Sequence, residues 1–131
     1  MKLLLRSLKP LDYHSTARFP SGVIPGVGYS IQRMSLGRRI ELAESIRDLA
    51  TALDFHKAGE SPRDQVEAAS LSAQIDRVYL NWGLAGISGL LIDGELPTVE
   101  ALYSRGPEDL LREIVDRIKL ECGLSDDERK N

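Results

Sequence analysis

The stretch GPEDLLREIVDRIKLECGLSDDERKN, Gly106–Asn131, decides the fold class of this chain. Its apolar residues recur at the spacing of one helix face and form a single stripe: Leu110, Leu111, Ile114, Val115, Ile118 and Cys122. Gly123 is expected to end this helix, with Leu124 folded back as the apolar contact of a Schellman motif. The SDDE motif at residues 125–128 has the spacing of a capping box and predicts one further helical turn. The stretch therefore predicts a helical protein, and it holds no catalytic constellation.

Three more helices are expected before this stretch. Thr98 is suited to cap a short helix that ends at Arg105. Ser35 is suited to cap a long helix that ends at Gly59, and Ser61-Pro62 to open another, because proline loses nothing at the first helical position. The first long helix carries an apolar stripe that we expect to face the core: Leu36, Ile40, Ala43, Ile46, Ala50 and Leu53. The short turn between the two long helices predicts that they form an antiparallel pair.

A run of glycines is expected to break the second long helix, at Gly83, Gly86 and Gly89. The following segment, Leu90–Leu96, has the pattern of a small β-hairpin because Asp93-Gly94 suits a type I′ turn. Since a two-stranded hairpin is marginal alone, it should pack on the helices.

Residues 1–34 differ in kind from the rest of the chain. Lys2–Leu8 and Val27–Met34 have strand character, whereas Pro10–Gly26 is rich in proline and glycine and indicates a loop. A loop of this length favours either two strands with a long connection or an arm that orders on a partner. We therefore expect a basic N-terminal arm with two short strands and a long loop, residues 1–34, and a helical domain, residues 35–131. The predicted fold class is mainly α: an antiparallel helical bundle with a small N-terminal β element or arm and a short β-hairpin near residues 90–96.

The composition is that of one ordinary globular domain. The chain has 131 residues, of which 42% are hydrophobic and 28% charged. Cys122 is the only cysteine, so no intrachain disulfide can form, which suits a reducing compartment. The apolar run Leu3–Leu5 is interrupted at once by Arg6 and is too short for a signal peptide or a membrane helix. We therefore expect a cytoplasmic protein with no membrane contact.

The charge is unevenly distributed along the chain. The net charge is -3, but residues 1–39 carry seven basic residues and one acidic residue, and residues 40–131 carry ten basic and nineteen acidic residues. A basic arm on an acidic body indicates contact with an acidic partner or with another copy of the chain. The alternative is that both faces are simply solvated. Nucleic acid is a weaker alternative, because few aromatic residues accompany the basic ones.

The sequence predicts no enzyme. The two histidines, His14 and His56, have no cysteine, histidine or carboxylate at the spacing of metal ligands. Neither a nucleophile elbow nor a phosphate-binding glycine loop occurs. We accordingly expect no catalytic residue, no cofactor and no metal. Cys122 has the place of a small apolar residue on a helix face, an interpretation that we favour over a reactive thiol.

Four residues are candidates for binding a partner: Arg33, Arg38, Arg39 and Trp82. Arg38 and Arg39 fall in the first turn of the long helix, where positive charge opposes the helix dipole and therefore favours an acidic partner. Trp82 beside the glycine break has the character of an interface anchor. The more ordinary interpretation, which we favour for Trp82, is a core residue that seals the hairpin onto the helices.

The C-terminal half of the chain resembles a known family. The blocks that carry the resemblance are Tyr79-Leu80-x-Trp82-Gly83-Leu84, Gly89-Leu90, Ile92-Asp93-Gly94, Gly106-Pro107-x-x-Leu110, Glu113-Ile114 and Gly123-Leu124-Ser125-x-x-Glu128-x-Lys130-Asn131. Together they resemble the tail assembly chaperones encoded in the tail-gene region of long-tailed phages and prophages. The resemblance covers residues 79–131 and, more loosely, Met34–Leu42.

This resemblance implies a mostly helical, non-enzymatic assembly factor. Members of the family bind the hydrophobic tape-measure protein, and some bind tail-tube subunits, which keeps these clients soluble until assembly. A rival expectation is a virion structural subunit, a head–tail connector or tail-completion protein that uses its arm to embrace a neighbour in a ring. A second rival is a small nucleic-acid-binding regulator that uses Arg33, Arg38 and Arg39.

Overall fold

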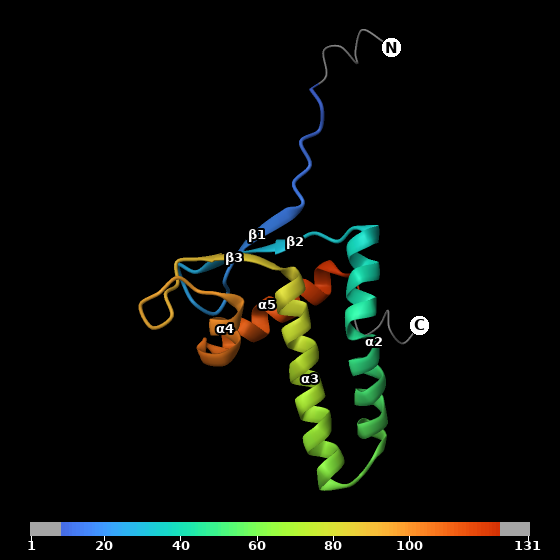
Figure 1. The fold of residues 1–131 in the computed structure, drawn as a ribbon. Helices are drawn as coiled ribbons and strands as arrows, with labels where there is room; N and C mark the ends of the chain where they lie inside the picture. The colour runs from blue at the N-terminus through green and yellow to red at the C-terminus, as the bar shows by residue number, and fades with distance from the viewer. Residues whose placement is uncertain (1–8, 124–131) are drawn as a thin grey trace, which may run out of the picture.

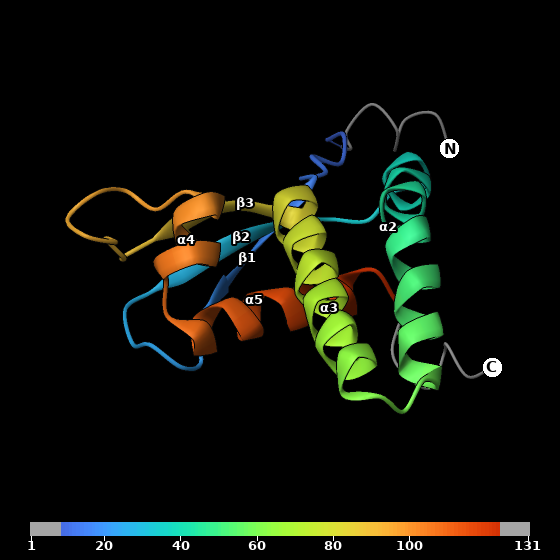
Figure 2. The same cartoon turned by 60° about the horizontal axis from the view of Figure 1, so that its bottom comes forward.

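The computed structural model describes residues 9–123 of the chain. Four helices and three strands follow one another in these residues: β1 (Thr16–Pro20), β2 (Gly28–Gln32), α2 (Leu36–Ala58), α3 (Pro62–Gly83), β3 (Leu84–Ser88), α4 (Val99–Arg105) and α5 (Glu108–Glu121). α2 and α3 form a long antiparallel hairpin whose closed end extends beyond the rest of the molecule (Figure 1). The sheet, α4 and α5 form a body around the other end of α3 (Figure 2). The predicted fold class, mainly α with a small β element, is confirmed.

The apolar stripe of α5 forms the centre of the core. All six of its residues are buried: Leu110, Leu111, Ile114, Val115, Ile118 and Cys122. Tyr29 and Ile31 of β2 and Leu80 of α3 are fully buried in the same cluster. α5 crosses the C-terminal half of α3 so closely that a Cβ on Gly83 would lie 2.7 Å from a methyl carbon of Ile118. The stripe predicted from the sequence is thus the element around which the sheet and α3 pack.

The predicted helix ends are confirmed where the structure describes them. The side chains of Ser35, Ser61 and Thr98 each accept a hydrogen bond from the backbone N–H three residues ahead. Gly123 follows α5 with a φ of 71°, the left-handed conformation expected of a helix stop. The predicted Schellman contact of Leu124 and the capping box at residues 125–128 lie outside the described residues.

A three-stranded antiparallel sheet, in the order β1-β2-β3, replaces the simple strand pair expected at the N-terminus. β2 lies within the predicted segment Val27–Met34, but β1 lies inside the segment Pro10–Gly26, which we expected to be a loop throughout. That expectation is wrong because Pro20 ends an edge strand, where a missing N–H costs no ladder bond. The other predicted strand, Lys2–Leu8, lies outside the described residues.

The glycine run after α3 also forms a strand rather than only a break. Leu84–Ser88, β3, pairs with β2, with a register irregularity between Ser30 and Ile31. The predicted hairpin near residues 90–96 is present as a single bridge between Ile92 and Glu95. Its turn residues Asp93 and Gly94 both have positive φ, 53° and 80°, as a type I′ turn requires.

The stripe predicted for the first long helix is wrong in its N-terminal half. Leu36 and Ile40 are 77% and 52% exposed, whereas Leu42, which we left off the stripe, is buried. Because α2 packs on α3, the face of α2 that lies over α3 is the buried one, and Arg38 rather than an apolar residue covers the end of α3 there. Within residues 9–123 no helix combines the length and apolar character needed to cross a membrane.

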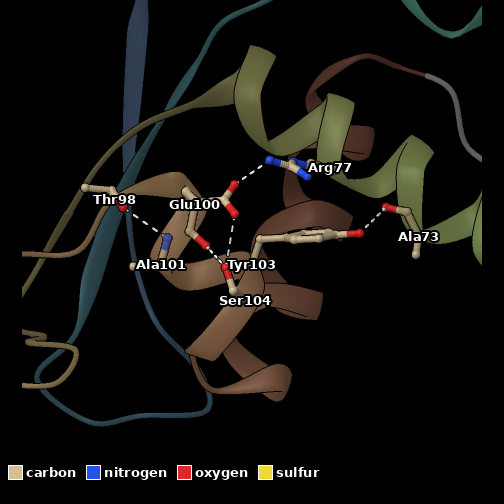
Figure 3. A network of polar contacts seen from close by, with 7 residues as sticks. All are labelled: Ala73, Arg77, Thr98, Glu100, Ala101, Tyr103 and Ser104. Carbon is tan, nitrogen blue, oxygen red and sulfur yellow. Dashed lines mark hydrogen bonds and ion pairs between the residues drawn. The ribbon is translucent and has the colours of Figure 1, made fainter.

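A polar network fixes α4 on α3 (Figure 3). Arg77 of α3 forms an ion pair with Glu100 of α4, and its guanidinium lies 5.1 Å from the ring centroid of Tyr103. The Tyr103 hydroxyl donates a hydrogen bond of 3.3 Å to the carbonyl of Ala73. Ser104 closes the network by donating to Glu100. These contacts explain how a helix of only seven residues keeps a defined place on the body.

Candidate partner-binding site

Three of the four predicted partner-binding residues meet at one junction inside the chain. Arg38 Nη2 donates a hydrogen bond of 2.5 Å to the carbonyl of Trp82, and its guanidinium carbon lies 4.5 Å from the centre of the Trp82 ring. Arg39 Nη1 donates a hydrogen bond of 2.7 Å to the carbonyl of Cys122. Arg33 stands apart: its N–H donates to Ser15 O, and its side chain is exposed. Among the described residues, no hydrogen bond or ring contact joins Arg33 to the other three.

The junction explains why positive charge sits at the start of α2. The carbonyls of Trp82 and Cys122 belong to the last turns of α3 and α5, where backbone acceptors lack partners within the helix and the dipole is negative. Arg38 and Arg39 therefore donate hydrogen bonds to carbonyls at the C-terminal ends of α3 and α5. The stabilisation from these bonds outweighs the unfavourable interaction of the two positive charges with the dipole of α2. The position of these arginines in the sequence favoured an acidic partner. In the structure their guanidinium groups instead bind backbone carbonyls of the same chain.

Trp82 is half-buried and packs against the core, which agrees with its ordinary interpretation. Its Nε1, like Arg38 Nε, is buried with no hydrogen-bond acceptor among residues 9–123. A buried donor without an acceptor costs stability, so packing and the guanidinium–ring contact must offset this cost.

Removal of the Arg39 side chain tests the role of the junction in stability. We expect Arg39→Ala to lower the free energy of unfolding by about 1 kcal/mol, because a charge-assisted hydrogen bond is lost at a partly exposed position. Arg33→Ala is the matched control, with an expected change below about 0.5 kcal/mol. Urea denaturation of the two variants measures both values, and equal losses would contradict a special role for Arg39.

A groove lies between α2 and α3, with a volume of about 470 Å³. Apolar, charged and polar residues of three helices line it: Ile46, Ala50, Leu53, Asp54 and Lys57 from α2, Ser72, Ile75, Asp76 and Tyr79 from α3, and Lys119 from α5. None of these residues was a candidate site residue in the sequence. The groove combines residues of α2 and α3 with Lys119 of α5, and periodicity within one helix does not predict such a combination.

Asp76 is the buried charge at one side of this groove. The residue is only 8% exposed and lies between two cations of α5, with Arg112 Nη1 at 2.9 Å and Lys119 Nζ at 3.4 Å from its carboxylate oxygens. Lys119 Nζ also lies 5.2 Å from the centre of the Tyr79 ring. The ion pairs compensate the desolvated carboxylate, as a buried charge requires. The sequence did carry one signal for Asp76, an acidic residue directly after Ile75 on the apolar side of the helix.

Apolar side chains remain exposed on the same helical hairpin. Leu36, Ile40 and Phe55 of α2 and Val66 of α3 are between 52% and 77% exposed. Single exposed apolar residues are common on any protein, and these four belong to the two helices that supply most of the groove lining.

The closed end of the hairpin is fixed by a histidine–carboxylate contact. His56 Nδ1 lies 2.9 Å from Asp64 Oδ1, and the hydroxyl of Ser61 donates to the other carboxylate oxygen at 2.8 Å. The hydrogen bonds from His56, then Ser61, lower the pKa of Asp64 below its ordinary value of 3.8. The carboxylate also occupies the space beside Gly59, where an added Cβ would lie 2.1 Å from Asp64 Oδ2.

This contact makes a small part of the stability depend on acid pH. Because the pKa of Asp64 is depressed in the folded state, its contribution is complete above pH 3.8 and is lost as the pH falls through the lower folded value. We therefore expect Asp64→Asn to melt at a lower temperature than the parent chain at pH 7, and the difference to close as the pH falls below 3.8. Thermal melts monitored by circular dichroism over this range measure it. A constant difference would assign the effect to the amide's packing instead.

No metal-binding arrangement appears in the described part of the chain. Residues 9–123 contain no group of three histidine, cysteine or carboxylate side chains placed to hold a metal ion. Cys122 is completely buried, and burial raises the pKa of its thiol to about 11, so it stays protonated and unreactive at neutral pH. This agrees with its interpretation as an apolar helix-face residue. His14 lies 3.6 Å from Asp12, but both side chains are largely exposed.

Comparison with protein-family models, characterised proteins and solved structures found no match to this chain. The features of this chain that bear on its function are therefore the α2–α3 groove, the exposed apolar residues of α2 and α3, and the family resemblance of the sequence.

Proposed function

We propose that this protein is a non-enzymatic tail assembly chaperone of a long-tailed phage or prophage, which holds a structural client in the α2–α3 groove until assembly. The observation that supports this proposal best is a groove lined by both apolar and charged residues, on a helical hairpin that projects from the body. The resemblance of residues 79–131 to this family supports the assignment to tail assembly.

The chemistry of the groove favours a helical segment as the ligand. Ile46, Leu53 and Ile75 offer apolar contacts along its length, which is how grooves between helices accept the apolar face of an amphipathic helix. Lys57 and Asp54 also line the groove, and their charges can orient the polar face of such a segment. The acidic charge of residues 40–131 helps to keep a complex with a hydrophobic client in solution. The resemblance names the tape-measure protein as the first client to test.

Co-expression with the tape-measure protein of the same genome tests the proposal. The full chain should increase the soluble fraction of the tape-measure protein, and the two should co-purify. Ala50→Arg places a long cation in the groove without removing a core side chain, so we expect it to abolish co-purification. Ala69→Arg, on an exposed position of α3 that does not line the groove, is the matched control and should bind as the parent chain does.

Circular dichroism melts of both variants show whether each is folded. If a folded Ala50→Arg variant still co-purifies with the tape-measure protein, the binding site lies outside the groove. Failure of the parent chain itself to bind or solubilise the tape-measure protein would reject the proposed function.

A virion structural subunit is the second candidate, and the N-terminal segment of the described chain favours it. Residues 9–14 are all exposed and run away from the body (Figure 1), with Leu11 at 89% and Tyr13 at 62% exposure. A ring of several subunits in solution would support this candidate. The nucleic-acid alternative has less support, since the guanidinium groups of Arg38 and Arg39 bind carbonyls of the same chain.

A further inference from the structure

β1 is an edge strand with an open outer side. Its inner side pairs with β2, and the ladder extends one residue past the strand, where Arg33 N–H donates to Ser15 O at 2.8 Å. Backbone polar groups of a strand alternate between its two sides, so Ser15, Ala17 and Phe19 point them at β2. The N–H and C=O groups of Thr16 and Arg18 consequently point outward, where no strand of the described chain meets them. Such an edge is a template for another strand.

Residues 9–14, which precede β1, have no strand partner among the described residues. β2 cannot pair with them, because the chain beyond Met34 turns into α2 at Ser35. Leu11 and Tyr13 share the parity of Ala17 and Phe19, which lie on the α5 side of the sheet, where the Arg117 guanidinium is 4.4 Å from the Phe19 ring centre. If residues 9–14 take up strand geometry, residues 9–20 become one long edge whose apolar positions are covered only in its second half.

In one antiparallel register, residues 10–20 of one copy are complementary to the same residues of a second copy. If a second copy pairs with its centre at Ser15, Asp12 of each copy lies directly opposite Arg18 of the other. In the same register Pro10 lies opposite Pro20, so that the two residues without an N–H face each other at the ends of the ladder. A shift by two residues in either direction loses both matches, since Asp12 then faces Thr16 or Pro20.

We propose that two copies of this chain pair along residues 10–20, which include β1, and form a closed dimer with one six-stranded antiparallel sheet. The backbone groups of Asp12, His14, Thr16 and Arg18 form the ladder between the copies. Leu11 and Tyr13 of each copy lie beside Phe19 and Ala17 of the other, which removes the exposed apolar surface of both arms from water. Because the contact is isologous, it closes at two copies and differs from the ring of a structural subunit.

Two rearrangements accompany this pairing. The chain bends at Ser15, so the arm must take up strand geometry there, which costs conformational entropy. Arg18 exchanges its exposed hydrogen bond with Ser88 Oγ for the cross-strand ion pair with Asp12. The new ladder and the buried apolar side chains offset these costs. Residues 10–20 do not line the α2–α3 groove, so the dimer and the binding of a client in the groove can be tested independently.

Light scattering of the full chain tests the dimer. The expected mass is twice the 14.5 kDa of one chain. Asp12→Arg and Arg18→Asp should each weaken the dimer at least tenfold, because like charges then lie opposite one another, and the double variant Asp12→Arg/Arg18→Asp should restore it. A monomeric parent chain, or a double variant no better than the single ones, would overturn the proposal. Binding of the tape-measure protein is measured separately and does not enter this result.

Cysteine cross-linking tests the register. Ser15 lies on the twofold axis at a non-hydrogen-bonded position, where the two Cα atoms approach to about 4.5 Å, so Ser15→Cys should form a covalent dimer under mild oxidation. Thr16→Cys is the matched control and should not cross-link, and Cys122 is buried in both variants. Cross-linking of Thr16→Cys in preference to Ser15→Cys would overturn the register, and therefore this proposal.

Discussion

Gly89→Ala should destabilise the protein by about 3 kcal/mol or more, the largest effect that we expect from a single methyl group. Gly89 has a φ of 79°, which alanine adopts only with strain. An added Cβ would also lie 2.2 Å from the carbonyl oxygen of Gly26, a backbone atom that no side-chain rotation can move away. The contact lies where the chain leaves β3 beside the start of β2, so the loss should also disturb the sheet.

Two other glycines separate the causes of this effect. Gly94 also has a positive φ, 80°, but an added Cβ there meets nothing within 4 Å, so Gly94→Ala should cost only about 1 kcal/mol. Gly86 has neither restriction, so Gly86→Ala should change the stability by less than about 0.5 kcal/mol. Urea denaturation of the three variants measures the series. A value for Gly89→Ala as small as that for Gly94→Ala would show that the two loops do not approach as closely as described.

Ile114→Ala should lower the free energy of unfolding by about 2–5 kcal/mol. Ile114 has no exposed surface and lies at the middle of the buried stripe of α5, so truncation leaves a cavity in addition to the lost transfer free energy. Because α5 packs against both α3 and the sheet, the cavity would loosen the contact between the projecting hairpin and the body. Denaturant unfolding of the full chain provides the measurement.

Leu120→Ala is the control for this prediction. Leu120 belongs to the same helix but is 62% exposed, so its truncation should cost less than about 0.5 kcal/mol. Similar losses for Ile114→Ala and Leu120→Ala would mean that the two residues are buried to a similar extent. If Leu120→Ala instead weakened the association of two chains, its face would belong to an interface, which light scattering of the same sample would detect.

The helices could be predicted from the sequence because their ends are local. Ser35, Ser61 and Thr98 cap through bonds to residues only three positions away, and Gly123 ends α5 through its own φ. The stripe of α5 was also predictable, since one helix face packed against both the sheet and α3 needs a continuous apolar row. The buried face of α2 was not predictable, because a helix that packs mainly on one other helix needs only a narrow contact, and Leu36 and Ile40 fall outside it.

The candidate site depended on contacts far apart in the sequence. The sequence predicts that Arg38 and Arg39 lie in the first turn of α2, where the helix dipole disfavours positive charge. It does not predict the carbonyls that they bind, because Trp82 and Cys122 lie 44 and 83 residues away. The groove is lined by Asp76 of α3 and Lys119 of α5, which are 43 residues apart, and Arg112 of α5 also pairs with the Asp76 carboxylate. Pairing of β1 and β3 with β2 likewise joins short segments whose own pattern is weak.

The sequence by itself thus determined where the helices begin and end, which face of α5 is buried and that Cys122 is an apolar residue. Only the tertiary structure decided that Pro10–Gly26 contains a strand, that the glycine run forms β3, and that a groove opens between α2 and α3. The physical reason is the range of the interactions. Capping and periodicity act within about four residues along the chain, whereas strand pairing, burial of charge and the shape of a groove depend on which elements meet in space.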